Sequence, residues 1–344
     1  MTAYFLRRFL LIIPTFLGIT VITFTILQVV PGGPLEMELL KLRGMGSPTG
    51  EVGVTGQSGV TVNIPESALE EMKKFYGFDK PIHVRYIRWL NNLFHLDLGK
   101  SYVYAEPVWD VIIERFPVSI YFGLIGFTLT YLICVPLGVI KAVKNGSAFD
   151  FGSSVLVFMG YSIPGWAFGA MMLILFGGGS FWDVFPLGGF RSEDFANLTF
   201  FQQVWDQIQH TILPVMSYLV GSFATLTILT KNSVIENLSQ DYIRTAFAKG
   251  LSEKRVIFYH ALKNSMIPIA TGLGHFLSLI LAGSILIEKV FNINGMGLLG
   301  YTSILNRDYP VTMGILVISS LLLLVGNIIS DIIYAIVDPR IRFK

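Results

Sequence analysis

Six stretches of the 344-residue chain are long and apolar enough to cross a membrane, and this pattern constrains the fold more than any other feature. A spanning helix needs about 20 mostly apolar residues, because backbone polar groups inside a bilayer must be satisfied within the helix. Only 14% of the residues are charged, against about 25% in soluble domains. The sequence therefore predicts an all-α membrane protein with six transmembrane helices. They lie at about 9–30, 118–140, 154–176, 212–230, 266–287 and 311–336.

The orientation follows from the distribution of Lys and Arg, which are enriched in short cytoplasmic loops. With a cytoplasmic N-terminus, 13 of these residues fall on the cytoplasmic side and three in the outside loops 177–210 and 288–310. The long loop 31–117 holds nine, but long loops cross membranes largely regardless of charge. Both termini are therefore predicted to be cytoplasmic. The first apolar run, which follows Arg7 and Arg8, is too long for a signal peptide, so we expect it to be retained.

The long outside loop has two textures. Residues 44–63 are rich in Gly, Ser and Thr and lack a hydrophobic period, which predicts a mobile excursion. Three short amphipathic helices are predicted after it, at 65–75, from Pro81 onward, and at 108–116, the last leading into the second span. Either these helices dock a soluble partner or form a vestibule, or they lie at the membrane interface.

The motifs that could carry chemistry are incomplete. Leu98–Ser101 (LGKS) resembles the end of a phosphate-binding loop, but Phe94 stands where that motif needs glycine. The five histidines show no i, i+4 pair, which argues against a metal site. Ser162 lies two residues before Pro164 within a span and is expected to hydrogen-bond backbone freed by a kink. Cys134 is expected to be a packing residue. The sequence predicts no catalytic residue and no cofactor, and its net charge of +2 does not suggest a nucleic-acid partner.

Asp331 is the one acidic residue well inside a predicted span, close to its cytoplasmic end. A charge at the centre of a bilayer costs about 2.5–3.5 kcal/mol on insertion scales, so such a residue is a functional candidate by default. Two interpretations remain open. In the first, Asp331 has a structural partner on a facing helix or a basic loop. In the second, it relays an ion or a proton.

The segment Lys231–Met266 is a basic, polar interruption between two apolar stretches, and it has helical rather than linker character. It is predicted to form two helices separated by Gly250, which suits the left-handed position that ends a helix. Asp241 or Ser239 is expected to cap a fresh start within the first helix, and Ser252 the second. Small residues are expected on an exposed face that another protein can approach closely: Thr245, Ala246 and Ala248. The alternative is a plain solvated amphipathic helix, but a mere connector needs only a few residues.

This segment resembles the EAA loop of bacterial ABC importer permeases, in the branch that imports dipeptides, oligopeptides and nickel. The resemblance rests on DYIRTAFAKGLS (Asp241–Ser252) followed by HALKNSMIP (His260–Pro268). Arg244 stands where the nominal motif has its first Glu. In that family the loop forms coupling helices that fit a groove on the ATPase subunit. The positions that the resemblance assigns to ATPase coupling are Asp241, Tyr242, Arg244, Thr245, Ala246, Ala248, Lys249, Gly250, Leu251 and Ser252.

The resemblance extends over nearly the whole chain. LRRFLLIIPT with VVPGGP looks like the family's first span and its exit, and FNINGMGLLG, NRDYPVTMG and SDIIYAIVDPRIRF look like the segments that flank and end its sixth span. Each motif alone is weak, but their order and spacing are specific. The glycine-rich excursion, with KAVKNGSAFD and GGGSFWDVFPLGGF, is most similar to the Yej-type subgroup, which is associated with oligopeptide and microcin C uptake.

The resemblance implies a type I ABC importer permease fold, an N-terminal helix plus a five-helix core, in the bacterial inner membrane. The implied divisions are 1–30 (first helix), 31–114 (periplasmic loop), 115–336 (core, with the coupling loop at 231–265) and 337–344 (cytoplasmic tail). The implied partners are a second permease subunit, an ATPase with two nucleotide-binding domains, a periplasmic peptide-binding protein and membrane lipids.

A different class of transporter is the main alternative. A secondary transporter driven by H⁺ or Na⁺ would use Asp331 as its relay, and it would be expected to show inverted repeats and further acidic residues in the membrane. The sequence shows neither. A scaffold subunit would leave the long coupling-like loop unexplained.

Overall fold

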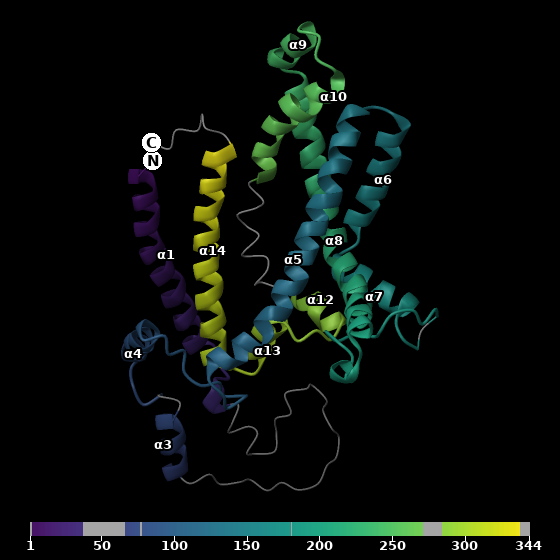
Figure 1. The fold of residues 1–344 in the computed structure, drawn as a ribbon. Helices are drawn as coiled ribbons and strands as arrows, with labels where there is room; N and C mark the ends of the chain where they lie inside the picture. Colours follow the sequence, from purple (N-terminus) through teal and green to yellow (C-terminus); the bar gives the residue numbers. More distant parts are fainter. Residues whose placement is uncertain (1, 37–65, 76–77, 180, 271–283, 338–344) are drawn as a thin grey trace. The chain divides into compact units, whose positions relative to one another are not determined.

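The computed structural model describes residues 2–36, 66–75, 78–179, 181–270 and 284–337. Regular structure in these residues is helical apart from two isolated β-bridges (Figure 1). In chain order the helices are α1 (Thr2–Val29), α3 (Glu66–Phe75), α4 (Ile82–Phe94), α5 (Val108–Val143), α6 (Ala148–Ser162), α7 (Gly165–Phe176), η1 (Phe195–Asn197), α8 (Phe200–Leu238), α9 (Asp241–Ala248), α10 (Glu253–Arg255), η2 (Val256–Ala261), α12 (Ile285–Val290), α13 (Met296–Leu305) and α14 (Tyr309–Val337).

Among the described residues, four helices are long and apolar enough to cross a membrane: α1, α5, α8 and α14. Helices α6 and α7 meet at a bend of 93°, and they make a fifth span if the bent pair is counted as one. These elements lie at five of the six predicted stretches. Most of the remaining stretch, 266–287, lies outside the described residues, as do the excursion 44–63 and the tail 338–344.

The bend between α6 and α7 occurs at Ile163 and Pro164, where a proline kink is predicted. The Ser162 hydroxyl donates to the Phe158 carbonyl at 2.9 Å, so it binds backbone in the turn before the break. Pro164 is the residue before the first turn of α7, a position where its missing N–H costs nothing. The kink is confirmed, and Ser162 bonds the backbone, but at the Phe158 carbonyl within α6 and not at a carbonyl freed by Pro164.

The helices of the outside loop agree with the sequence pattern, with one difference. Helices α3 and α4 begin one residue after the prolines that open them, Pro65 and Pro81. The third predicted helix, 108–116, is not a separate element. It is the first part of α5, which runs unbroken through Pro117 and Pro136 for 36 residues.

The chain divides into two compact units, each described by itself. The smaller unit comprises Phe9–Arg115 and Leu299–Leu321. Its core contains Phe24 and Leu27 of α1 and Tyr309 and Met313 of α14, with the rings of Tyr86 and Trp89 from α4 packed against them.

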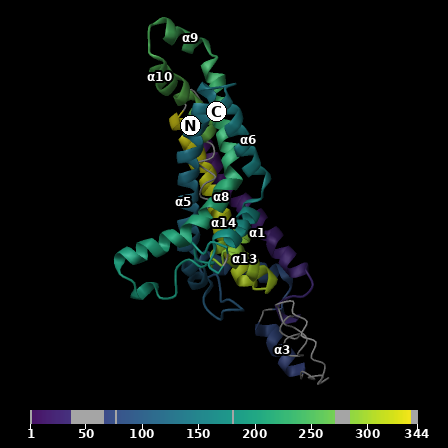
Figure 2. The same cartoon turned by 90° about the vertical axis from the view of Figure 1, so that its right-hand side faces the viewer.

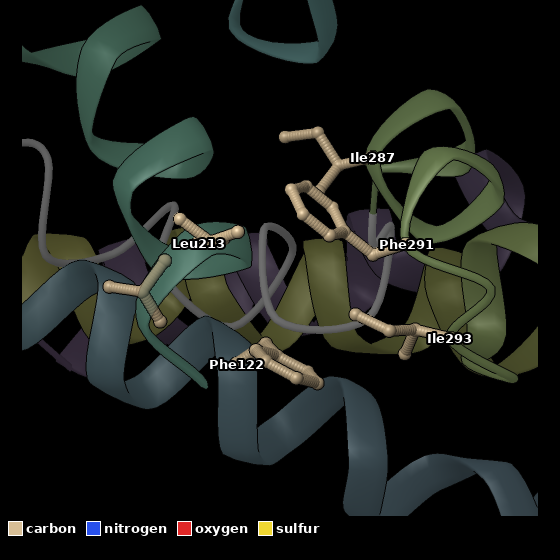
Figure 3. Close-up of a cluster of buried hydrophobic side chains, with 6 residues drawn as sticks. Phe122, Leu213, Ile287, Phe291 and Ile293 are labelled. Atoms are coloured by element: carbon tan, nitrogen blue, oxygen red, sulfur yellow. The ribbon is translucent and has the colours of Figure 1, made fainter. Parts of the chain in front are cut away.

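The larger unit comprises Met1–Arg8, Phe116–Leu298 and Leu322–Lys344. One of its cores joins α5, α8, α12 and the segment after α12, as the side chains in Figure 3 show. The buried residues of this core are Phe122, Leu213, Val215, Ile287, Phe291 and Ile293.

Helices α5 and α8 of the larger unit cross in very close contact at Gly138. A Cβ atom added there would lie 2.6 Å from Thr230 Cβ and 2.8 Å from the backbone oxygen of Thr227. Cys134, one turn earlier on α5, is fully buried, and its Sγ lies 3.6 Å from the Phe223 carbonyl oxygen of α8. The expected packing role of Cys134 is confirmed.

Candidate coupling site

Helix α8 carries the basic segment away from the apolar part of the chain. Its 39 residues extend about 58 Å at 1.5 Å per residue, roughly twice the hydrocarbon core of a bilayer. In both views of the structure, α9 and α10 lie beyond the ends of α5 and α6 (Figures 1 and 2). The last turns of α8 and the segment after it therefore form a projection.

Helix α9 begins after a two-residue break, but not with the predicted cap. Ser239 is the C-cap residue of α8, and its hydroxyl donates to the Glu236 carbonyl at 2.7 Å. Gln240 occupies the N-cap of α9, and Asp241 is the first helical residue. The prediction that Asp241 or Ser239 caps this helix is wrong. Asp241 still favours the helix start, because a negative charge in the first turn interacts well with the helix dipole.

Gly250 ends α9 in the left-handed conformation that the sequence predicts, with a φ of 78°. The Gly250 N–H donates to the Phe247 carbonyl at 2.9 Å, and the Leu251 N–H donates to the Ala246 carbonyl at 3.3 Å. These two bonds define a Schellman motif, the helix ending in which a glycine turns the chain back and satisfies the last carbonyls. The chain then reverses toward α10, with Ser252 at its N-cap position as predicted.

The faces of α9 differ from the predicted arrangement at one position. Ala246 was expected on the exposed face, but it is only 6% exposed and packs with Ile243, Val256 and Ala261. The reason is its spacing from Ile243, since residues three apart share a helix face. The expectation of exposure for Ala246 is wrong: it holds α9 against the returning helix. The other residues assigned to coupling are exposed, except Leu251, which is half-buried.

Two aromatic side chains of α9 are also exposed. Phe247, which the sequence reasoning did not single out, is 46% exposed, and Tyr242 is 39% exposed. The Tyr242 hydroxyl donates to Asn237 Oδ1 at 2.8 Å, which fixes its ring beside the end of α8. Phe247 places an apolar ring at the flank of the exposed face that carries Thr245 and Ala248. The signal was present in the sequence as the one large apolar residue between two small ones.

The return from α10 is anchored to α8. The residues from Val256 to Ala261 form a π-helical turn that the sequence did not predict. Beyond it, Ser233 and Ser265 bond reciprocally, since each hydroxyl donates to the other residue's carbonyl at 3.1 Å. The projection is therefore a helical hairpin, and its outgoing and returning segments are hydrogen-bonded to each other at its base.

Asp331 has the partner that the structural interpretation requires. It is 6% exposed and forms an ion pair with Arg8 of α1, and Arg8 also donates to the Asn327 carbonyl at 3.0 Å. An acidic residue within a span is expected to be paired in this way. The pairing supports a structural role and does not need a relay.

Comparisons with known proteins place this geometry in a family. A family model described as "Binding-protein-dependent transport system inner membrane component" matches residues 134–343. The chain is 41% identical over 363 aligned positions to "Inner membrane ABC transporter permease protein YejB" of Escherichia coli O157:H7, which it covers completely. It is 40% identical to "Peptidoglycan transport system permease protein YejB" of Agrobacterium fabrum, covering 99% of that protein. It is 36% identical to "Oligopeptide transport system permease protein AppB" of Bacillus subtilis over the full length of both chains.

The resemblance inferred from the sequence is confirmed by these matches. The matched region includes the whole projection and its Gly250 turn. The chain therefore belongs to the family of inner membrane components of binding-protein-dependent transport systems: it is a multi-pass permease subunit of an ABC transporter and is not itself the catalytic subunit.

Proposed function

We propose that this chain imports peptides as one half of a translocation pathway and couples to an ATPase through α9. The observation that carries the proposal is the projecting helix α9, ended by Gly250, in a member of the permease family. Its exposed face combines the apolar ring of Phe247 with small residues, which suits insertion into a groove of a soluble partner.

The proposed fold is that of a type I ABC importer permease with six spans and both termini in the cytoplasm. Residues 1–30 form the first helix, 31–114 a periplasmic loop and 115–336 the permease core. The positive-inside distribution supports this orientation, and the described helices supply up to five of the spans. The sixth would use the stretch around 266–287.

The proposed substrates are peptides of the oligopeptide or microcin C-like type. The names of the similar proteins refer to peptidoglycan and to oligopeptides, and the sequence is most similar to the Yej-type subgroup. A periplasmic binding protein would deliver the peptide, and a second, similar permease subunit would complete the pathway.

The proposed mechanism is mechanical. ATP binding closes two nucleotide-binding domains of the partner ATPase, and α9, seated between them and the membrane, moves with them. The projection and the membrane part of α8 belong to one unbroken helix of 39 residues, so displacement of its end moves its membrane part. The pathway then alternates between facing the periplasm and facing the cytoplasm.

The energy source provides the first test. The permease complex, reconstituted in liposomes with its ATPase, should take up peptide only with ATP, and loaded binding protein should stimulate ATP hydrolysis. The same complex carrying an ATPase inactivated in its phosphate-binding loop should take up none, whatever the proton gradient. Uptake that survives this inactivation and collapses with an uncoupler would support the ion-driven alternative instead.

Replacement of Asp331 by Asn tests the same alternative at one residue. Because Asp331 pairs with Arg8, we expect the variant to lower the amount of subunit in the membrane, while uptake per assembled complex stays near the wild-type value. Quantitative blotting alongside uptake separates the two quantities. A relay predicts the opposite pattern, with normal amounts of a subunit that does not transport.

The orientation is tested by labelling. In a Cys134→Ser background, a cysteine at Glu71 of α3 should react with an impermeant thiol reagent added to the periplasmic side. A cysteine at Ser252 should react only after the membrane is permeabilised. Both positions are exposed, so burial does not mask either one. The reverse labelling pattern would overturn the orientation and the coupling role of α9 with it.

A further inference from the structure

A cluster of three charged residues, two of them buried and the third, Lys231, half-buried, lies at the base of the projection. The Lys231 ammonium of α8 is 2.8 Å from Oδ1 and 2.7 Å from Oδ2 of Asp150, which belongs to α6. The Lys141 ammonium of α5 is 3.2 Å from Oδ1 of the same carboxylate. Asp150 is 6% exposed and Lys141 1%. One carboxylate thus joins three helices of the larger unit.

Each of the three charged groups makes several hydrogen bonds or ion pairs. The three N–H donors of Lys141 are satisfied within α6, by the Asp150 carbonyl at 2.9 Å and by the hydroxyls of Ser153 and Ser154 at 2.8 Å and 2.7 Å. The Asp150 carboxylate also accepts the Gly146 N–H at 3.1 Å, which fixes the turn between α5 and α6. Lys231 donates to both carboxylate oxygens of Asp150, and these bonds join α8 to α6.

The charge balance makes Lys231 the unexpected member. Lys141 and Asp150 alone form a neutral pair, so Lys231 adds an excess positive charge to a site largely closed to water, which is unfavourable for stability by itself. A buried ion pair is weak support for a stabilising role, but it fixes the relative position of the helices that carry it. This favours a positioning role for the contact between α6 and α8.

The position of Lys231 on α8 connects the cluster to the projection. Lys231 is seven residues before Leu238, the last residue of α8, and α9 follows after two residues. Between them, Val234 packs with Val139 and Ala142 of α5. A displacement of α9 is therefore transmitted to the turn of α8 that carries Lys231, the residue bonded to Asp150 of α6.

The other end of the α6–α7 pair reaches the core shown in Figure 3. A Cβ atom added to Gly169 of α7 would lie 2.5 Å from Ser217 Oγ of α8 and 2.8 Å from the ring of Phe291. At Gly169, α7 therefore packs directly against Ser217 and Phe291, so a shift of α7 at this position displaces groups of that core.

We propose that Asp150 is a positioning residue for energy coupling: its bonds to Lys231 make α6 move with α8, and its ion pair with Lys141 holds α5 to the same carboxylate, so that the motion of α9 reaches the bent α6–α7 pair. This inference rests on the proposed coupling function of α9. It assigns the step from the projection to the membrane to a specific carboxylate, which has no local signal in the sequence because Asp150 and Lys231 are 81 residues apart.

The test is Lys231→Met in the reconstituted complex. Methionine keeps an unbranched side chain and leaves the neutral pair of Lys141 and Asp150 intact, so we expect normal insertion and normal co-purification of the ATPase. Stimulation of ATP hydrolysis by loaded binding protein, and peptide uptake, should each fall about fivefold or more, the size of a typical lost coupling. Lys231→Arg, which keeps the charge and the bonds, should restore both.

The matched control is Lys144→Met. Lys144 lies on the turn between α5 and α6 but is exposed, with its ammonium 5.4 Å from the centre of the Phe149 ring, and it should behave like wild type. If Lys231→Met prevents insertion, Lys231→Gln is measured in its place and must show the same loss of stimulation.

The outcomes separate the two proposals. A wild-type complex whose ATP hydrolysis does not respond to loaded binding protein refutes the proposed function. A wild-type complex that responds, together with a Lys231→Met complex that responds equally, refutes the role of Asp150 alone. Equal loss in Lys231→Met and Lys144→Met would assign the effect to the surface charge of the turn and would also refute it.

Discussion

Gly250→Val should abolish uptake while leaving the subunit in the membrane. Valine is β-branched, and a φ of 78° is strongly disfavoured for such residues, with a strain of about 1–3 kcal/mol. The chain relieves the strain by leaving the Schellman turn, which breaks the bonds to the Phe247 and Ala246 carbonyls. Helix α9 then loses its defined direction at the tip of the projection. Uptake, ATP hydrolysis with and without loaded binding protein, and membrane content are to be measured together.

The design of this experiment benefits from the surroundings of Gly250. A Cβ atom added there would meet nothing within 4 Å, so the valine acts through backbone conformation rather than through a clash. Asparagine tolerates the left-handed region, and Gly250→Asn should therefore retain most of the uptake. Lys254→Ala, an exposed change on the next helix, should have little effect. Normal uptake and stimulation by Gly250→Val would make the segment a charged connector and refute the coupling proposal.

Gly138→Ala should have the second largest effect, and it should lower the stability of the subunit, whereas Gly250→Val abolishes uptake without removing the subunit from the membrane. The added methyl group would overlap Thr230 Cβ at 2.6 Å and the Thr227 carbonyl oxygen at 2.8 Å, and a backbone atom cannot rotate away. Helices α5 and α8 must separate, and overpacking of this kind typically costs about 1–3 kcal/mol. We expect less folded subunit in the membrane and a lower unfolding temperature in detergent.

A second glycine provides the control for this prediction. Gly152 is also helical, on the neighbouring α6, and a Cβ atom there meets nothing within 4 Å. Gly152→Ala should leave stability unchanged or raise it slightly, because alanine favours the helix by about 1 kcal/mol over glycine. If Gly138→Ala matches Gly152→Ala in detergent, the close crossing of α5 and α8 is not required for stability.

Local features of the site were predictable from the sequence, and contacts between distant residues were not. Gly250 predicts its turn because almost no other residue adopts that conformation. Pro164 predicts a kink because proline has no N–H for a helical hydrogen bond. The buried position of Ala246 was also readable, three residues after Ile243, but its small size suggested a contact surface instead. The pairs Asp150 with Lys231 and Asp331 with Arg8 depend on helix packing, which no spacing in the chain specifies.

The bend between α6 and α7 has a consequence for the biosynthesis of the protein. The two helices have 15 and 12 residues, so their lengths are about 22 Å and 18 Å, and neither can cross a hydrocarbon core of about 30 Å alone. A nascent chain that ends after α7 contains the complete spans α1 and α5, but neither α6 nor α7 adds a straight helix long enough to span by itself. Both helices pack on α8, which is synthesised later. Stable integration of this part of the permease must therefore await α8, and a chain truncated before it should be recognised and degraded.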